Sequence, residues 1–286
     1  MNLEQFSEAA SGLSTLRLRL DHSGIASERG IASERGIASE SGIARLSLNR
    51  PAQRNALNRA MCEDLLTACA LLRQCAGSNL VRVVLLDAEG PVFCAGADLK
   101  ERQGMHSQAE VTARRQLAFD AYAALEALPQ PVIALLQGPA VGSGCEIAGA
   151  CDFILASARA SFRYPEVGWG TIGATQRLPR MVGKRLAKEL LYTGRLVEAS
   201  EALRIGLINQ LLEQDALPAA ALALAQRIAA APPLAMQLTK RCLDQGMDRD
   251  RAGALAIEQQ AIAENLAGSD WQGAIADFGN KAGNTP

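Results

Sequence analysis

A glycine-rich turn in the middle of the chain constrains its fold more than any other segment. The apolar run Pro131–Leu136 precedes Gly142-Ser143-Gly144-Cys145-Glu146, and small or apolar residues continue to Cys151. This order predicts a buried strand, a tight turn and the start of a helix, with the acid Glu146 one turn inside that helix. Unpaired N–H groups and the positive end of the helix dipole favour an anion or a developing oxyanion. The segment therefore predicts a catalytic or binding site for a group that carries or develops negative charge.

A second glutamate, Glu166, follows Tyr164-Pro165. Taken alone it reads as a surface residue or a partner of Arg163, because most glutamates are exposed. Glu146 lies among apolar and small neighbours, where an unpaired carboxylate is costly to bury. If the two carboxylates converge in apolar surroundings, their pKa values rise and they can divide acid and base roles.

Composition excludes several classes of function. The chain has 286 residues, 49% hydrophobic and 21% charged, with a net charge of −1. The balance gives no global attraction to nucleic acid or anionic lipid, so we expect neither as a partner. No apolar run reaches about 18 residues, and the N-terminus lacks a secretory pattern, so we expect no membrane span. Seven cysteines without a CxxC pair fit a reducing cytoplasm, the expected location.

The shortage of histidine directs the chemistry toward carboxylates. The chain contains two histidines, His22 and His106, and both occur in polar, loop-like contexts. A histidine-rich zinc site and a Ser-His-Asp triad are therefore not expected, and neither is any other metal site.

A repeated hexad interrupts the first predicted hairpin. Gly24–Arg29 recurs at Gly30–Arg35 and, with one change, at Gly36–Ser41. Without the repeats, the alternating runs that begin at Leu16 and Ile43 would form a plain hairpin joined at glycine. A hexapeptide β-helix would need more turns to bury a core. We interpret residues 24–42 as an insertion in a hairpin loop, which chains tolerate because closure entropy rises slowly with length.

Strand and helix patterns alternate after the hairpin. Asn58 is a candidate helix cap, residues 107–128 are predicted as a helix, and three short apolar runs are predicted as strands: Val81–Leu86, Pro131–Leu136 and Phe153–Ala156. After Gly183 the pattern is nearly all helical, with segments at 216–231, 233–245 and 249–267. This order predicts an α/β fold of right-handed β-α-β units. We expect an N-terminal segment at 1–15, a core at 16–206 and a helical module at 207–286.

Several segments together resemble the crotonase (enoyl-CoA hydratase/isomerase) family. They are Phe93–Glu101, Gly138–Glu146 and Ala174–Pro179, which occur in the same order as in the family. The resemblance as a whole runs from about Leu16 to Lys281. The resemblance implies a spiral core of ββα units with a C-terminal helical module used in trimerisation, and hence a homo-oligomer, either a trimer or a dimer of trimers.

The resemblance also implies roles for individual residues. Glu146 and Glu166 match the two catalytic glutamates of the family's hydratases, and the backbone N–H groups of Ala97 and Ser143 match its oxyanion hole. Glycine is common in the family at the position of Ser143. Candidate coenzyme A contacts are Arg54, Ala95, Ala97, Asp98, Leu99, Lys100, Phe278 and Lys281, the last two reaching the CoA of a neighbouring subunit.

The segment between Glu166 and Thr175 is shorter than in many relatives, where it lines the acyl pocket. Trp169 is either part of that pocket's wall or ordinary packing. Arg114 and Arg115 are candidates to meet a substrate carboxylate, since the sequence around Leu178–Leu191 is similar to hydratases of branched or glutaconyl-type substrates.

The resemblance implies reversible addition of water to a 2-enoyl-CoA, with CoA as part of the substrate and no other cofactor. An enoyl-CoA isomerase on the same scaffold is the nearest alternative, although isomerases of the family commonly keep one of the two glutamates. A non-catalytic protein that binds RNA or protein is the alternative from another class. The low net charge and the 4% aromatic content argue against RNA.

Overall fold

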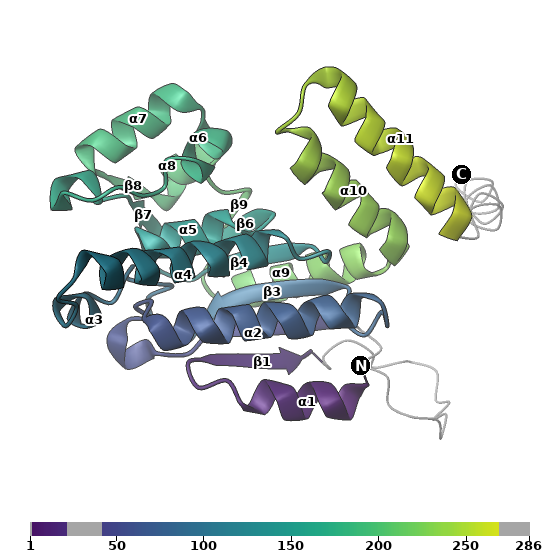
Figure 1. Cartoon of the computed structure of the whole chain (residues 1–286), viewed down its shortest axis with the longest axis horizontal. Helices are drawn as coiled ribbons and strands as arrows, with labels where there is room; N and C mark the ends of the chain where they lie inside the picture. Colours follow the sequence, from purple (N-terminus) through teal and green to yellow (C-terminus); the bar gives the residue numbers. More distant parts are fainter. Residues whose placement is uncertain (1, 22–41, 269–286) are drawn as a thin grey trace. The chain divides into compact units, whose positions relative to one another are not determined.

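The main sheet is built from short strands of nearly continuous apolar residues. The computed structural model describes residues 2–21 and 42–268, and their main sheet has the strand order β1-β2-β3-β4-β6-β9 (Figure 1). The strands are β1 (Leu16–Leu20), β2 (Ile43–Leu48), β3 (Val83–Ala88), β4 (Val132–Leu136), β6 (Phe153–Ser157) and β9 (Gln210–Leu212). All neighbouring pairs except β1–β2 run parallel. The predicted strands beginning near Val81, Pro131 and Phe153 are confirmed.

The predicted N-terminal hairpin is also confirmed. β1 and β2 pair antiparallel, in a register that runs from Leu16 opposite Leu48 to Leu20 opposite Ala44. Gly42 precedes β2 with a positive φ of 61°, and its carbonyl accepts hydrogen bonds from the N–H groups of Arg82 and Val83. The predicted insertion at 24–42 lies outside the described residues apart from Gly42.

Alternate residues of the strands enter two separate cores, because successive side chains point to opposite faces of a sheet. On one face, Leu46, Val84 and Leu86 pack with α2 (Arg59–Ala76) and α4 (Gln108–Glu126), which contact each other (Figure 1). α1 (Leu3–Ser11) joins this core through Phe6. The other face carries α9 (Leu217–Ala229), an alanine-rich helix. Both cores hold the strand ends in place, and the loops after those ends form the site.

The helix predictions agree with the structure in their centres. Asn58 caps α2, where its Oδ1 accepts from the Met61 N–H at 3.0 Å. The helix expected at 107–128 is α4, capped by Ser107. The three C-terminal helices are α9, α10 (Pro233–Gly246) and α11 (Arg251–Gly268).

A second, smaller sheet holds the glycine-rich turn. Its strand order is β5-β7-β8, formed by β5 (Ala140–Val141), β7 (Ser161–Arg163) and β8 (Leu196–Glu198). Around it lie α5 (Ser143–Gly149), α6 (Arg177–Val182), α7 (Lys184–Thr193) and α8 (Ala199–Arg204). The expectation of nearly all helix after Gly183 is thus wrong at β8 and β9, since three residues are too few to show the two-residue period of a strand.

The chain divides into two compact units after Ala229, and not at the expected 206/207 boundary. The reason is that β9 adds an edge strand to the main sheet and α9 buries Ala221 and Ala225 completely against it. The second unit is described from Ala230 to Gly268 and consists of α10 and α11, which pack together. Within the described residues no single helix is long and apolar enough to cross a membrane; α9 with α10, a bent pair, passes by length and composition alone.

Deleting Ile25–Gly42 tests the insertion. The deletion leaves Asp21–Gly24 before Ile43, so a glycine still precedes β2. Loop closure depends weakly on length, so the free energy of unfolding should change by no more than about 1–2 kcal/mol. Chemical denaturation of the two proteins measures this difference. A deletion protein that cannot fold would show that the repeats are structural.

Candidate active site

A cleft lies in the first unit, with about 950 Å³ of empty space when the open solvent at its mouth is included. Its walls come from the loop after β3, from α4, from the glycine-rich turn and from the segment after β7. Predicted site residues from all of these segments line it: Ala95, Ala97, Asp98, Leu99, Arg114, Arg115, Ser143, Glu146, Glu166 and Trp169. The structure therefore brings most of the candidate residues into one place.

Two loops of the cleft approach each other closely at glycines. Gly96 has a φ of 95°, and a Cβ added there would lie 2.8 Å from the Val141 carbonyl oxygen and 3.9 Å from the Ser143 nitrogen. A Cβ on Gly144 would lie 2.4 Å from the Cys94 carbonyl oxygen. Neither position has room for a side chain, so these glycines allow the backbones around Ala97 and Ser143 to meet.

The N–H groups of Ala97 and Ser143 remain outside the nearby backbone ladders. In the bridge between Leu57 and Ala97, the Leu57 N–H donates to the Gly96 carbonyl and the Asp98 N–H donates to the Leu57 carbonyl. The Ala97 N–H takes no part in that bridge. Ser143 is the first residue of α5, so its N–H has no acceptor within the helix. The cleft thus offers two backbone donors from adjoining segments.

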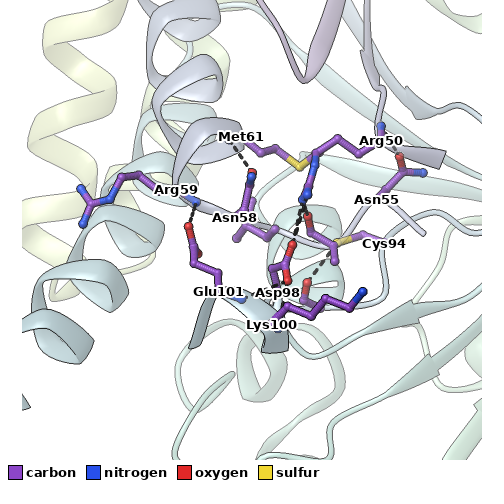
Figure 2. Close-up of polar contacts among 12 residues, drawn as sticks. Arg50, Asn55, Asn58, Arg59, Met61, Cys94, Asp98, Lys100 and Glu101 are labelled. Atoms are coloured by element: carbon purple, nitrogen blue, oxygen red, sulfur yellow. Dashed lines mark hydrogen bonds and ion pairs between the residues drawn. The ribbon is translucent and has the colours of Figure 1, made fainter. Parts of the chain in front are cut away.

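An ion pair fixes the loop that carries Ala97. Figure 2 shows Asp98 facing Arg50. An Arg50 guanidinium nitrogen lies 3.2 Å from Asp98 Oδ2, while Asp98 Oδ1 caps α3 (Leu99–Gln103) by accepting from the Lys100 N–H. The fully buried Asn55 donates to the carbonyls of Glu89 and Val92. The sequence assigned Asp98 to coenzyme A, but its carboxylate already has these internal partners.

Glu146 is buried in the first turn of α5, with 7% of its surface exposed. Burial raises its pKa, and the Arg177 guanidinium, 3.1 Å from its Oε2, opposes that increase. The carboxylate therefore keeps one cationic partner within a mostly apolar wall.

Glu166 follows β7 and lies between two glycines. A Cβ on Gly142 would come within 2.9 Å of its Oε1, and one on Gly173 within 3.0 Å of its Cγ. Its Oε2 is buried and makes no hydrogen bond in the described chain. Burial raises the pKa of Glu166, and the negative charge of Glu146 raises it further. The pair is therefore asymmetric: one carboxylate has an ion-pair partner and the other has an unbonded buried oxygen.

Arg114 and Arg115 line the cleft, but their guanidinium groups already have partners within the protein. Arg114 contacts Glu101 at 2.7 Å and donates to the Leu57 carbonyl at 2.7 Å. Arg115 donates to the Thr171 hydroxyl and the Ile172 carbonyl, so it ties the short segment after Glu166 to α4.

Four of the large apolar residues that line the cleft remain exposed, namely Leu99, Phe119, Trp169 and Ile172. Each exposes a large part of its surface, with Trp169 at 59% and Ile172 at 71%. Of the two interpretations of Trp169, the structure favours the pocket wall over ordinary packing.

Two of the expected coenzyme A contacts are not among the residues that line the cleft. Arg54 and Lys100 are exposed and do not line it. Phe278 and Lys281 fall outside the described residues. Within residues 2–21 and 42–268, no group of His, Cys, Asp and Glu is arranged to hold a metal ion. Burial raises the pKa of Cys62 to about 11 and of Cys94 to about 12, so these thiols stay protonated at neutral pH.

The sequence reasoning missed two residues beside the glutamates. Arg177 falls within the segment Ala174–Pro179, where no pattern assigns it a role, and its contact with Glu146 depends on how α6 packs on α5. Tyr122 lines the cleft, and its hydroxyl group lies beside the Ser143 side chain. The signal available in the sequence was the general rule that a buried carboxylate needs a partner, but that rule does not name the partner.

The chain matches known proteins over most of its length. The family model described as Enoyl-CoA hydratase/isomerase matches residues 38–283. A short-chain-enoyl-CoA hydratase from Clostridium acetobutylicum is 37% identical over 82% of this chain and 89% of its own. A crotonyl-CoA hydratase from Syntrophomonas wolfei is 36% identical, over 82% and 90%. The crystal structure of an enoyl-CoA hydratase from Bacillus anthracis superposes with a TM-score of 0.79 at 37% identity, over 84% and 93%.

Gly142→Ala tests the close packing of Glu166. Gly142 has a φ of 49°, and the added methyl would displace the Glu166 carboxylate, so we expect a fall in kcat of about 10²-fold. Gly170→Ala is the matched control, because Gly170 also has a positive φ but nothing lies within 4 Å of its Cβ position. The control should lose only about 1–2 kcal/mol of stability. Equal kcat losses in the two variants would argue against a packing role. Steady-state kinetics and thermal melts compare them.

Proposed function

The chain belongs to the enoyl-CoA hydratase/isomerase family, and we propose that it is a hydratase that adds water reversibly across the 2,3 double bond of an enoyl-CoA thioester. The observation that carries this proposal is the presence of two glutamates, the buried Glu146 and the half-buried Glu166, in one cleft beside two available backbone N–H groups. An isomerase needs to move one proton between carbons, whereas hydration needs a base for water and an acid for carbon. The pair of carboxylates suits the second task.

The N–H groups of Ala97 and Ser143 would bind the thioester carbonyl oxygen. Attack on the β carbon pushes electrons toward that oxygen, and fixed donors stabilise the enolate-like charge more than they stabilise the neutral ground state. The helix N-terminus at Ser143 adds its positive dipole end. The Ser143 side chain lies beside the Tyr122 hydroxyl group of α4.

The two glutamates would divide the proton transfers. Glu146, paired with Arg177, accepts a proton from water as the water oxygen bonds to the β carbon. The double-bond electrons move to form the enolate, and Glu166, whose pKa is raised by burial, donates its proton to the α carbon. Exchange with solvent then restores both groups. The sequence of steps uses water and the thioester alone.

We propose that the acyl chain is uncharged. The part of the cleft that would surround the acyl chain of the substrate includes Met105, Val111, Ala118 and Phe119. The nearby Arg114 already forms an ion pair with Glu101. A carboxylate beside Arg114 would lose its water without gaining that guanidinium as a partner. Arg102, a cation that lines the cleft without an ion pair among the described residues, is exposed to solvent, where an ion pair is worth little. The glutaconyl-type substrate expected from sequence is therefore disfavoured.

We propose further that the chain forms a homo-oligomer, a trimer or a dimer of trimers. The support lies in the second unit, where α10 and α11 leave a set of large apolar side chains exposed: Leu243, Met247, Leu255, Ile262 and Leu266. Exposed apolar groups of this number favour association with another surface.

Glu146→Gln and Glu166→Gln should each lower kcat for hydration of crotonyl-CoA by about 10²–10⁴-fold, because each removes one proton-transfer group. Coenzyme A affinity should stay nearly intact in both variants. The assay follows loss of the conjugated double bond, with calorimetry of CoA binding as a check on the fold. Near-full activity in either folded variant would contradict the mechanism, and double-bond migration without water addition would indicate the isomerase.

Substrate charge gives a separate test of the acyl pocket. We expect crotonyl-CoA to have a kcat/KM on the order of 10²-fold higher than an enoyl-CoA of similar length that ends in a carboxylate, since that carboxylate must be desolvated beside an Arg114 that is already paired with Glu101. Parallel kinetics at one pH and salt concentration provide the comparison. A preference for the charged substrate would mean that Arg114 or Arg115 leaves its internal partner on binding.

A further inference from the structure

Arg177 lies at the start of α6 and connects three parts of the site. One guanidinium nitrogen lies 3.1 Å from Glu146 Oε2, and the other terminal nitrogen pairs with Glu126 at the end of α4. The guanidinium carbon lies 5.7 Å from the centre of the Tyr122 ring, a cation–π distance. Because α5 packs against both α4 and α6, this one side chain fixes the base relative to two neighbouring helices.

The electrostatic surroundings of Glu146 make Arg177 its important partner. The charged and titratable groups that act on Glu146 from the packed elements are Arg177 of α6, Glu126 and Tyr122 of α4, and Tyr164 and Glu166 after β7. Of these, Glu126 and Glu166 are acids and the tyrosines are neutral at ordinary pH. Arg177 is thus the only member of this set that favours the ionised carboxylate.

Glu166 has a different environment. The nearby Arg115 is bound to Thr171 and Ile172, and one oxygen of Glu166 has no hydrogen bond. The two glutamates therefore differ in cation pairing as well as in burial, since Glu146 is buried and ion-paired whereas Glu166 is half-buried and has an oxygen that is unbonded in the described chain. A difference of this kind separates a base from an acid in one pocket.

We propose that Arg177 is a positioning residue that holds Glu146 in the ionised, aimed state required of the base, and that Glu126 and the Tyr122 ring hold Arg177 in turn. The proposal rests on the hydratase function given above. Tyr122 also lies beside Ser143 at the proposed oxyanion-binding turn. The end of α4 therefore supports the base through Arg177 and adjoins the residue that supplies one backbone donor.

Kinetics of Arg177→Met provide the first test. The loss of the cation leaves burial unopposed, so the pKa of Glu146 should rise further, and the ascending limb of kcat against pH should move upward by about one pH unit or more. At pH 7 we expect kcat to fall by about 10²-fold with KM changed by less than about threefold. Part of the loss should return at higher pH.

Two variants serve as controls for that result. Arg177→Lys keeps a positive charge and should restore the wild-type limb, with a smaller loss of kcat from the missing second contact. Arg180→Met removes an exposed arginine from the same helix and should leave the whole profile unchanged. A kcat loss in Arg177→Met with an unmoved limb, or equal behaviour of the lysine and methionine variants, would overturn the proposal.

A readout independent of turnover separates this proposal from the function beneath it. The carboxyl carbon of Glu146 can be titrated by NMR in ¹³C-glutamate-labelled protein, with Glu146→Gln assigning the signal. The titration midpoint should be higher in Arg177→Met than in the wild type, and close to wild type in Arg177→Lys. If the wild type hydrates no enoyl-CoA but this shift occurs, the proposed function fails while the coupling stands. An unchanged midpoint in the methionine variant refutes the coupling even if the enzyme is an active hydratase.

Discussion

The contact between two backbones at Gly96 and Gly144 is the constraint on which the site depends. At both positions a Cβ would overlap a carbonyl oxygen of the other segment, 2.8 Å from Val141 O and 2.4 Å from Cys94 O. The close approach places Ala97 and Ser143 on one wall of the cleft. The buried Arg50–Asp98 pair and Asn55 support one of the two loops from below, so the donors are held before any substrate arrives. Such preorganisation is what makes backbone donors effective in catalysis.

The same close packing determines how easily each of the two carboxylates ionises. Glu166 lies between Gly142 and Gly173 with one buried oxygen unbonded, whereas Glu146 reaches Arg177. Burial makes ionisation costly for both, and the unequal pairing then decides which one keeps its charge most easily. The helices α4 and α6 supply Tyr122, Glu126 and Arg177, so the chemistry of the turn depends on side chains from elements that contribute no catalytic group themselves.

The structure and the comparisons confirm much of the fold predicted from sequence. The apolar runs at Val81, Pro131 and Phe153 became parallel strands, and Asn58 became a cap, because these patterns depend on local periodicity and local hydrogen bonds. The strands β8 and β9 and the boundary after Ala229 were not predicted. A three-residue strand has no measurable period, and an alanine-rich helix such as α9 does not reveal in sequence which sheet will bury it.

The sequence by itself determined which residues must approach a ligand closely: the glycines of the turn, and the glutamate embedded among apolar residues, where a carboxylate needs a reason to be buried. The tertiary structure decided which side chains contact these residues. Arg114, a candidate for a substrate carboxylate, is paired with Glu101 from α3, and Arg177 reaches Glu146 and Glu126 from positions far apart in the chain. Two charged side chains form an ion pair when packing brings them close together. The distance between them depends on how the helices cross and not on their spacing along the sequence.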